Sequence, residues 1–98
     1  MASGVARRVF GGFIGTGSAL NITTVGFRPR SVQLRNASTR LELYWQEGMA
    51  DASAFKKVAA GTSTVITTAG ITPLANGFTV GTDAVNSTGE LVHYEAQE

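Results

Sequence analysis

The clearest hydrophobic pattern in the chain lies at residues 40–46, where apolar and polar side chains alternate one by one. Leu41, Leu43 and Trp45 fall on one face of an extended chain, and Tyr44 falls on the other. This period of two predicts a β-strand with one buried face. Because a buried tryptophan removes on the order of 150–250 Å² from water, we expect Trp45 in the core, and Tyr44 is the one aromatic residue expected to face outward.

A second strand is predicted within residues 26–36. Pro29 fixes its own φ angle and disfavours the helical region for the residue before it, so the segment begins as a turn. Val32 and Leu34 then alternate with polar residues up to Asn36, where a short polar break begins. We expect these two side chains to pack beside Trp45.

The remaining strands are shorter and are separated by glycine-rich or polar segments. They are expected at residues 9–17 (running into a turn), 20–25, 62–68, 77–81 and 91–96, with Val92, Tyr94 and Ala96 sharing one face of the last. Polar or glycine-containing turns are expected at residues 37–39, 69–73 and 82–89. Residues 48–60 are interpreted as an excursion with at most a short helix. Many short strands with little helix predict an all-β fold, a single antiparallel β-sandwich or a jelly-roll-like domain over residues 9–98.

Composition adds a constraint on the surface. The chain has 98 residues, of which 43% are apolar and only 15% charged, against a typical charged share of about 25%. One modest core is therefore expected, with a surface of small polar and apolar groups. Such a surface is common on proteins that pack against copies of themselves or a larger assembly, and it also fits a threonine-rich β protein.

Charge is unevenly distributed along the chain. Residues 1–40 contain six arginines and no acid, whereas the rest contains two lysines and seven acids, which gives a net charge of +1. Two interpretations stay open: the uneven charge steers a partner or a neighbouring subunit, or the opposite charges balance each other within one fold. Residues 1–8 have no apolar periodicity and are expected to form a flexible arm that carries Arg7 and Arg8.

The residue inventory argues against an enzyme. There is no cysteine and one histidine, His93, which is expected on the outer face of the last strand, and no spacing of metal ligands or nucleophile motif is present. The order of Gly12, Gly15 and Gly17 does not match a dinucleotide-binding loop. The arginines lack a recognition helix or an exposed aromatic platform, so nucleic acid is not an expected partner. No cofactor is expected.

The sequence predicts neither a membrane-spanning segment nor a signal peptide. No apolar run approaches ~18 residues, and residues 1–8 lack the apolar segment of a signal peptide. We expect assembly in the cytoplasm without a membrane partner.

Two stretches together resemble small β-domain proteins of tailed-bacteriophage particles. The first is Gly12-Phe13-Ile14-Gly15-Thr16-Gly17-Ser18, followed by Asn21-Ile22 and Gly26-Phe27-Arg28-Pro29-Arg30-Ser31-Val32. The second is Gly77-Phe78-Thr79-Val80-Gly81-Thr82-Asp83, continuing through Val85-Asn86 and Gly89 to Tyr94 and Ala96. In that family, a glycine-rich turn ends an opening strand and a Gly-Phe-x-Pro turn starts a core strand. The two stretches frame most of the chain.

The resemblance implies a non-enzymatic structural protein of the virion. The chain length favours a head decoration (cement) protein that sits on the capsid surface and binds the major capsid protein as a homo-oligomer, most often a trimer. The alternative is a tail-fibre or tail-tip adsorption module that binds a host carbohydrate. For a decoration protein, we expect Arg7, Arg8, Arg28 and Arg30 to contact the capsid or a neighbouring subunit.

Overall fold

Eight antiparallel strands form one continuous sheet in the computed structural model, which describes residues 7–98. The strands are β1 (Arg8–Ile14), β2 (Leu20–Ile22), β3 (Ser31–Asn36), β4 (Glu42–Gln46), β5 (Ser53–Lys57), β6 (Ser63–Leu74), β7 (Gly77–Val80) and β8 (Leu91–Gln97). A short 3-10 helix, η1 (Ala84–Asn86), lies between β7 and β8. The spatial order is β1-β8-β3-β4-β5-β6-β7-β2, so β1 and β2 are the two edges of the sheet.

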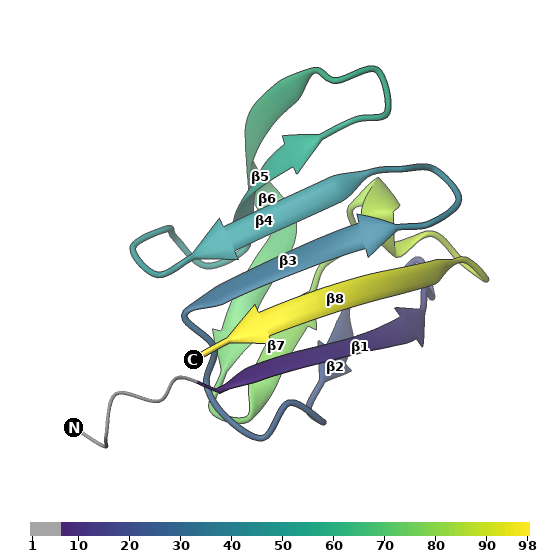
Figure 1. The fold of residues 1–98 in the computed structure, drawn as a ribbon. Helices are drawn as coiled ribbons and strands as arrows, with labels where there is room; N and C mark the ends of the chain where they lie inside the picture. The colour runs from purple at the N-terminus through teal and green to yellow at the C-terminus, as the bar shows by residue number, and fades with distance from the viewer. Residues whose placement is uncertain (1–6) are drawn as a thin grey trace.

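The sheet curls so that its two halves face each other. Figure 1 shows β6, β7 and β2 behind β3, β8 and β1. Across the interior, the ring of Phe78 on β7 meets the ring of Tyr94 on β8 edge-on, with centroids 5.3 Å apart. The predicted all-β, antiparallel fold with little helix is confirmed. The sandwich or jelly roll was too specific, because the two halves are parts of one curled sheet rather than separate sheets.

The curl is produced at a bulge in β6. The first half of this strand pairs with β5 and the second half with β7, and the register to β5 jumps between Ile66 and Ile71. Ala69 has a φ of 61°, and a side chain on Gly70 would collide with the backbone of β5. Extra residues in one strand of a pair interrupt its hydrogen bonding to the neighbouring strand and bend the sheet. The predicted turn at residues 69–73 is therefore wrong, since the chain bends there but β6 continues to Leu74.

Residues 48–60 contain a strand that the sequence did not predict. β5 lies between β4 and β6, and Phe55 pairs with Tyr44 on one side and Val65 on the other. The alanines of this segment suggest a loose helical spacing, but pairing with two neighbouring strands overrides so weak a local preference.

The predicted core around Trp45 is confirmed. Val32, Leu34 and Leu43 are fully buried, Trp45 is buried, and Leu41 packs against them while half-buried. The indole N–H of Trp45 donates to the carbonyl of Ala50 at 3.2 Å, which satisfies its only polar group. The rest of the core comes from Ile22, Val25, Phe27, Ala54, Ile71, Phe78, Val80, Val85, Val92, Tyr94 and Ala96.

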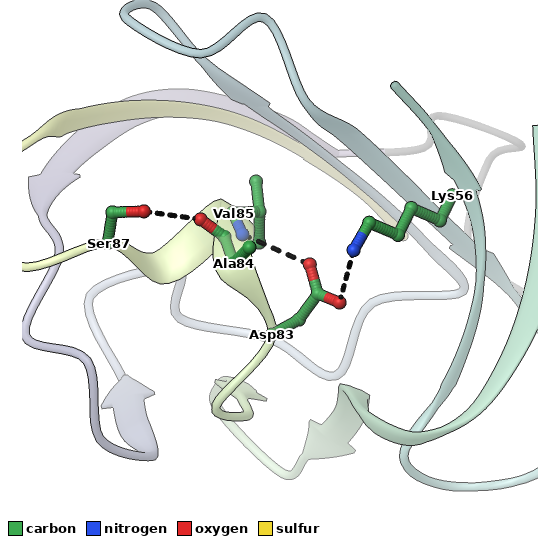
Figure 2. Close-up of polar contacts among 5 residues, drawn as sticks. All are labelled: Lys56, Asp83, Ala84, Val85 and Ser87. Atoms are coloured by element: carbon green, nitrogen blue, oxygen red, sulfur yellow. Dashed lines mark hydrogen bonds and ion pairs between the residues drawn. The ribbon is translucent and has the colours of Figure 1, made fainter. Parts of the chain in front are cut away.

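An ion pair ties β5 to the loop that follows β7. In Figure 2, Lys56 reaches across to Asp83, and its ammonium group donates to one carboxylate oxygen at 2.9 Å. The other oxygen accepts from the backbone N–H of Val85 at 3.0 Å and so caps η1. Ser87 ends the same segment by donating to the carbonyl of Ala84. The polar loop expected at residues 82–89 therefore has an ordered centre.

Two buried asparagines organise the connections at the end of the sheet where β3 finishes. Asn86 accepts from the backbone of Thr16 and donates to the carbonyls of Ser18 and Gly81, at 2.7–3.0 Å. Asn36 donates to the carbonyl of Val85 and accepts from the turn that follows it. The Asn36 amide also donates to the carboxylate of Glu90 at 3.0 Å, so both asparagine side chains have hydrogen-bond partners, as buried amides require.

Only the last part of the expected arm lies within the described residues. Residues 1–6 fall outside them. Arg8 is the first residue of β1, opposite Gln97, and the carbonyl of Arg7 accepts from the N–H of Glu98 at 2.8 Å. Arg7 and Arg8 therefore continue the β1–β8 ladder.

Candidate interaction surface

The outward side chains of six neighbouring strands form one continuous row. Successive cross-strand partners connect β1, β8, β3, β4, β5 and β6 at a single level of the sheet. In spatial order, they are Phe10, Glu95, Gln33, Tyr44, Phe55 and Val65. We call this row, with the parallel row Gly12, His93, Arg35, Glu42, Lys57 and Ser63, the outer face.

Large apolar side chains on the outer face are open to solvent. The exposed fraction is 68% for Phe10, 37% for Tyr44, 45% for Phe55 and 58% for Val65. The outward position of Tyr44 is as predicted, but the sequence expected no other outward aromatic, and two more are present. Exposed aromatic residues that share one face with polar groups are typical of interaction surfaces.

Two shallow grooves cross the outer face on either side of Gln33. One holds about 220 Å³ between Phe10 and the side chains of Arg35, His93 and Glu95. The other holds about 210 Å³ beside Tyr44, Phe55 and Lys57. Each groove therefore combines an aromatic wall with hydrogen-bonding groups. His93 lies on the outer face as predicted.

The arginines proposed for partner binding lie mostly at one end of the sheet. Arg28 and Arg30 precede β3, and with Glu98 they line a groove of about 290 Å³ that also reaches Trp45. Arg7 arrives at the same end and donates two hydrogen bonds to Glu98, at 3.0 and 2.5 Å. Its guanidinium also lies 4.9 Å from the ring centroid of Phe27.

Arg8 lies apart from these three. It is on the outer face, where it forms an ion pair with Glu95 at 3.2 Å. Arg28 and Arg30 therefore line one groove, which we call the arginine groove. Arg7 bonds to Glu98 at the wall of this groove, and Arg8 lies on the neighbouring face.

The carboxylate of Glu98 is stabilised in its charged form by the arginines around it. The hydrogen bonds from Arg7 hold the pKa of its carboxyl below the usual range, and the charge of Arg30 acts in the same direction. The same pairing raises the pKa of Arg7. Both groups are exposed, so the pair contributes little to stability and is sensitive to salt.

The uneven charge along the chain is largely balanced in space. Four ion pairs each join an arginine from the first forty residues to a glutamate from the rest: Arg7–Glu98, Arg8–Glu95, Arg30–Glu47 and Arg35–Glu42. Within residues 7–98, Arg28 forms no ion pair. Of the four arginines proposed for partner binding, Arg28 is therefore the most available for one.

Two further observations concern other kinds of site. Over residues 7–98, no three His, Asp or Glu side chains gather closely enough to hold a metal ion. In the same part of the chain, no helix is long and apolar enough to cross a membrane.

Comparisons of the chain with protein-family models, with curated proteins and with solved structures give no match.

Proposed function

We propose that this protein is a structural component of a bacteriophage particle, a head decoration protein that binds the capsid shell. The observation that carries the proposal is the outer face, where three aromatic side chains and Val65 lie in solvent while the interior of the same sheet is filled. Cross-strand pairs such as Tyr44 with Phe55 add little to the fold, whereas several exposed aromatic groups on one face are typical of a surface that binds a partner. The resemblance to small virion β-domain proteins supplies the kind of partner.

The arginine groove extends the proposed contact. Arg28 is free of ion pairs within residues 7–98, Arg30 lines the same groove, and Arg7 is paired with Glu98 at its wall. An acidic segment of the major capsid protein would meet Arg28 directly and compete with Glu98 and Glu47 for the other two arginines. Attachment is then partly apolar and partly electrostatic, and only the second part weakens with salt.

A binding assay with capsid shells that lack the protein tests the proposal. Purified wild-type protein should co-sediment with the shells, and Phe55→Lys should abolish most of that binding. Ala19→Lys is the matched control, because Ala19 is exposed on a loop outside the outer face. Equal binding by the two variants, or recovery of the protein only with tails when purified particles are dissected, would reject the decoration role.

One observation also favours the alternative, a tail adsorption module that binds a carbohydrate. The grooves place Phe10 and Tyr44 beside Gln33, His93 and Glu95, and sugar rings stack on aromatic faces while their hydroxyls bond to such polar groups. Titration of the protein with host-surface polysaccharide distinguishes the two roles. Binding that Tyr44→Ala removes and Ala19→Lys keeps would support the carbohydrate role, and absence of any binding would reject it.

A further inference from the structure

Strand β1 has one side without a hydrogen-bonding partner among residues 7–98. The carbonyl of Arg7 accepts from Glu98 and the N–H of Gly15 donates to Glu90, so the odd-numbered residues of this segment bond to β8 and its flanks. Successive residues of an antiparallel strand direct their N–H and C=O groups to opposite sides. The even-numbered residues, Arg8, Phe10, Gly12 and Ile14, therefore direct theirs away from the sheet, and Figure 1 shows β1 at its edge.

This edge lacks the features that usually prevent pairing with another chain. Natural edge strands are short, bulged, or interrupted by proline and charge. β1 pairs with β8 without a break over seven residues, and after Arg8 it contains neither charge nor proline. Its outward side chains include two exposed apolar groups, Phe10 and Ile14. The other edge, β2, is only three residues long.

We propose that β1 pairs antiparallel with β1 of a second copy, about a two-fold axis at Gly11. Gly11 is the middle residue of the strand, so this register gives complete overlap. Arg8 then lies opposite Ile14 of the second copy, and Phe10 lies opposite Gly12. Each strand contributes four N–H and four C=O groups, and the pair forms eight hydrogen bonds in which all of them are used. Two curled sheets become one continuous sheet, a form of β-augmentation.

The side chains fit this register. Phe10 and Gly12 lie on the outer face, and the absence of a side chain at Gly12 leaves room for the phenyl ring of the second copy to cover its backbone. Ile14 is placed against the aliphatic stem of Arg8. A shift by two residues along the strand would leave part of each edge unpaired and place like residues opposite each other, such as Phe10 against Phe10.

The edges of the sheet favour a two-fold pair over the trimer expected from the sequence. A cyclic trimer needs contact between two different surfaces, and a trimer joined through the sheet edges would set β1 of one copy against β2 of the next. Seven residues would meet three, which leaves most of β1 unpaired. Self-pairing of β1 has no such mismatch. The proposal concerns the isolated protein and does not depend on the proposed role in the virion.

The mass of the protein in solution tests this pairing. Wild-type protein should sediment as a dimer at tens of micromolar, and Phe10→Lys should weaken the dimer by about tenfold or more, because it sets a charge on the edge. Val65→Lys is the control, since Val65 is similarly exposed on the outer face but lies in β6, away from the edge. A wild-type monomer, a trimer, or a dimer that both variants preserve equally would overturn the proposal.

The register is tested by cross-linking, because the chain contains no cysteine of its own. Arg8→Cys and Ile14→Cys are made separately, and each is treated with a short bismaleimide alone and as a mixture. We expect covalent dimers mainly in the mixture, as residues 8 and 14 of different copies lie opposite each other. Equal cross-linking within each single variant would overturn the full-overlap register.

Discussion

The two faces of the sheet differ in how completely their apolar side chains are buried. On the inner face, Leu43 and Trp45 of β4 belong to the core cluster and have almost no exposure. On the outer face, Tyr44 stands between them in sequence yet remains in solvent with Phe10 and Phe55. Burial in the core accounts for the apolar residues of the inner face. The apolar residues of the outer face stay exposed to solvent after the chain has folded. This difference separates the residues that make the protein stable from those proposed to give it a partner.

The largest expected effect contrasts Trp45 with its neighbour Tyr44. Trp45→Ala should lower the free energy of unfolding by about 3–5 kcal/mol, because it removes a buried indole and leaves a cavity. Tyr44→Ala should cost about 1 kcal/mol or less, since half-exposed strand residues contribute little to the fold. Urea unfolding of both variants gives the comparison. Similar losses for the two would mean that the outer face is also part of the folding core.

The inner face was predictable from the sequence because its signal is local. In β3, β4 and β8, large apolar residues recur at every second position, and Val32, Leu34, Leu43, Trp45 and Tyr94 are all buried as that pattern predicts. β5 and the second half of β6 gave no such signal. Their strand conformation depends on neighbours in space, and a bulge at Ala69 breaks the alternation within β6.

The outer face was predictable only in part. Tyr44 lies in a regular alternation, so its direction could be inferred, whereas Phe10 precedes two glycines and Phe55 follows an alanine-rich segment. The exposure of Phe10 depends on Gly11 lying inward, which the sequence hints at only through the glycine pair. The ion pairs of the arginines join residues up to 91 positions apart, as in Arg7 with Glu98. No local pattern shows such contacts.

A second contrast uses neighbouring glycines on opposite faces of β1. A Cβ at Gly11 would lie 2.6 Å from the ring of Tyr94, whereas at Gly12 the nearest atom is a carbonyl oxygen at 3.3 Å. Gly11→Ala should therefore cost about 1–3 kcal/mol through overpacking, because the Tyr94 ring is held by Phe13 and Phe78. Gly12→Ala should cost less, about 1 kcal/mol or below, because only a carbonyl oxygen at 3.3 Å has to shift slightly. Thermal unfolding at one protein concentration compares them, and an equal loss would contradict the inward placement of Gly11.

A third contrast compares the partly buried ion pair between Lys56 and Asp83 with an exposed one. Asp83→Ala should cost about 1–2 kcal/mol, because it removes the cap of η1 and leaves Lys56 without its partner. Asp83→Asn keeps an acceptor for the N–H of Val85 and should lose less. Glu47→Ala breaks an exposed pair with Arg30 and should have no measurable effect. Chemical unfolding of the three variants tests this order, and a loss in Glu47→Ala as large as in Asp83→Ala would contradict it.

The smallest expected effect lies at the arginine groove and depends on pH. Because Arg7 lowers the folded-state pKa of Glu98, the pair stabilises the protein above the unfolded-state pKa of that carboxyl, and the stabilisation is lost as the pH falls through the folded-state value. Glu98→Gln removes this contribution and leaves Arg7 over Phe27. Thermal midpoints of the wild type and the variant should differ slightly at neutral pH and low salt, and should converge in acid or at high salt. Equal midpoints at neutral pH and low salt would show that packing on Phe27, rather than the charge of Glu98, holds Arg7 in place.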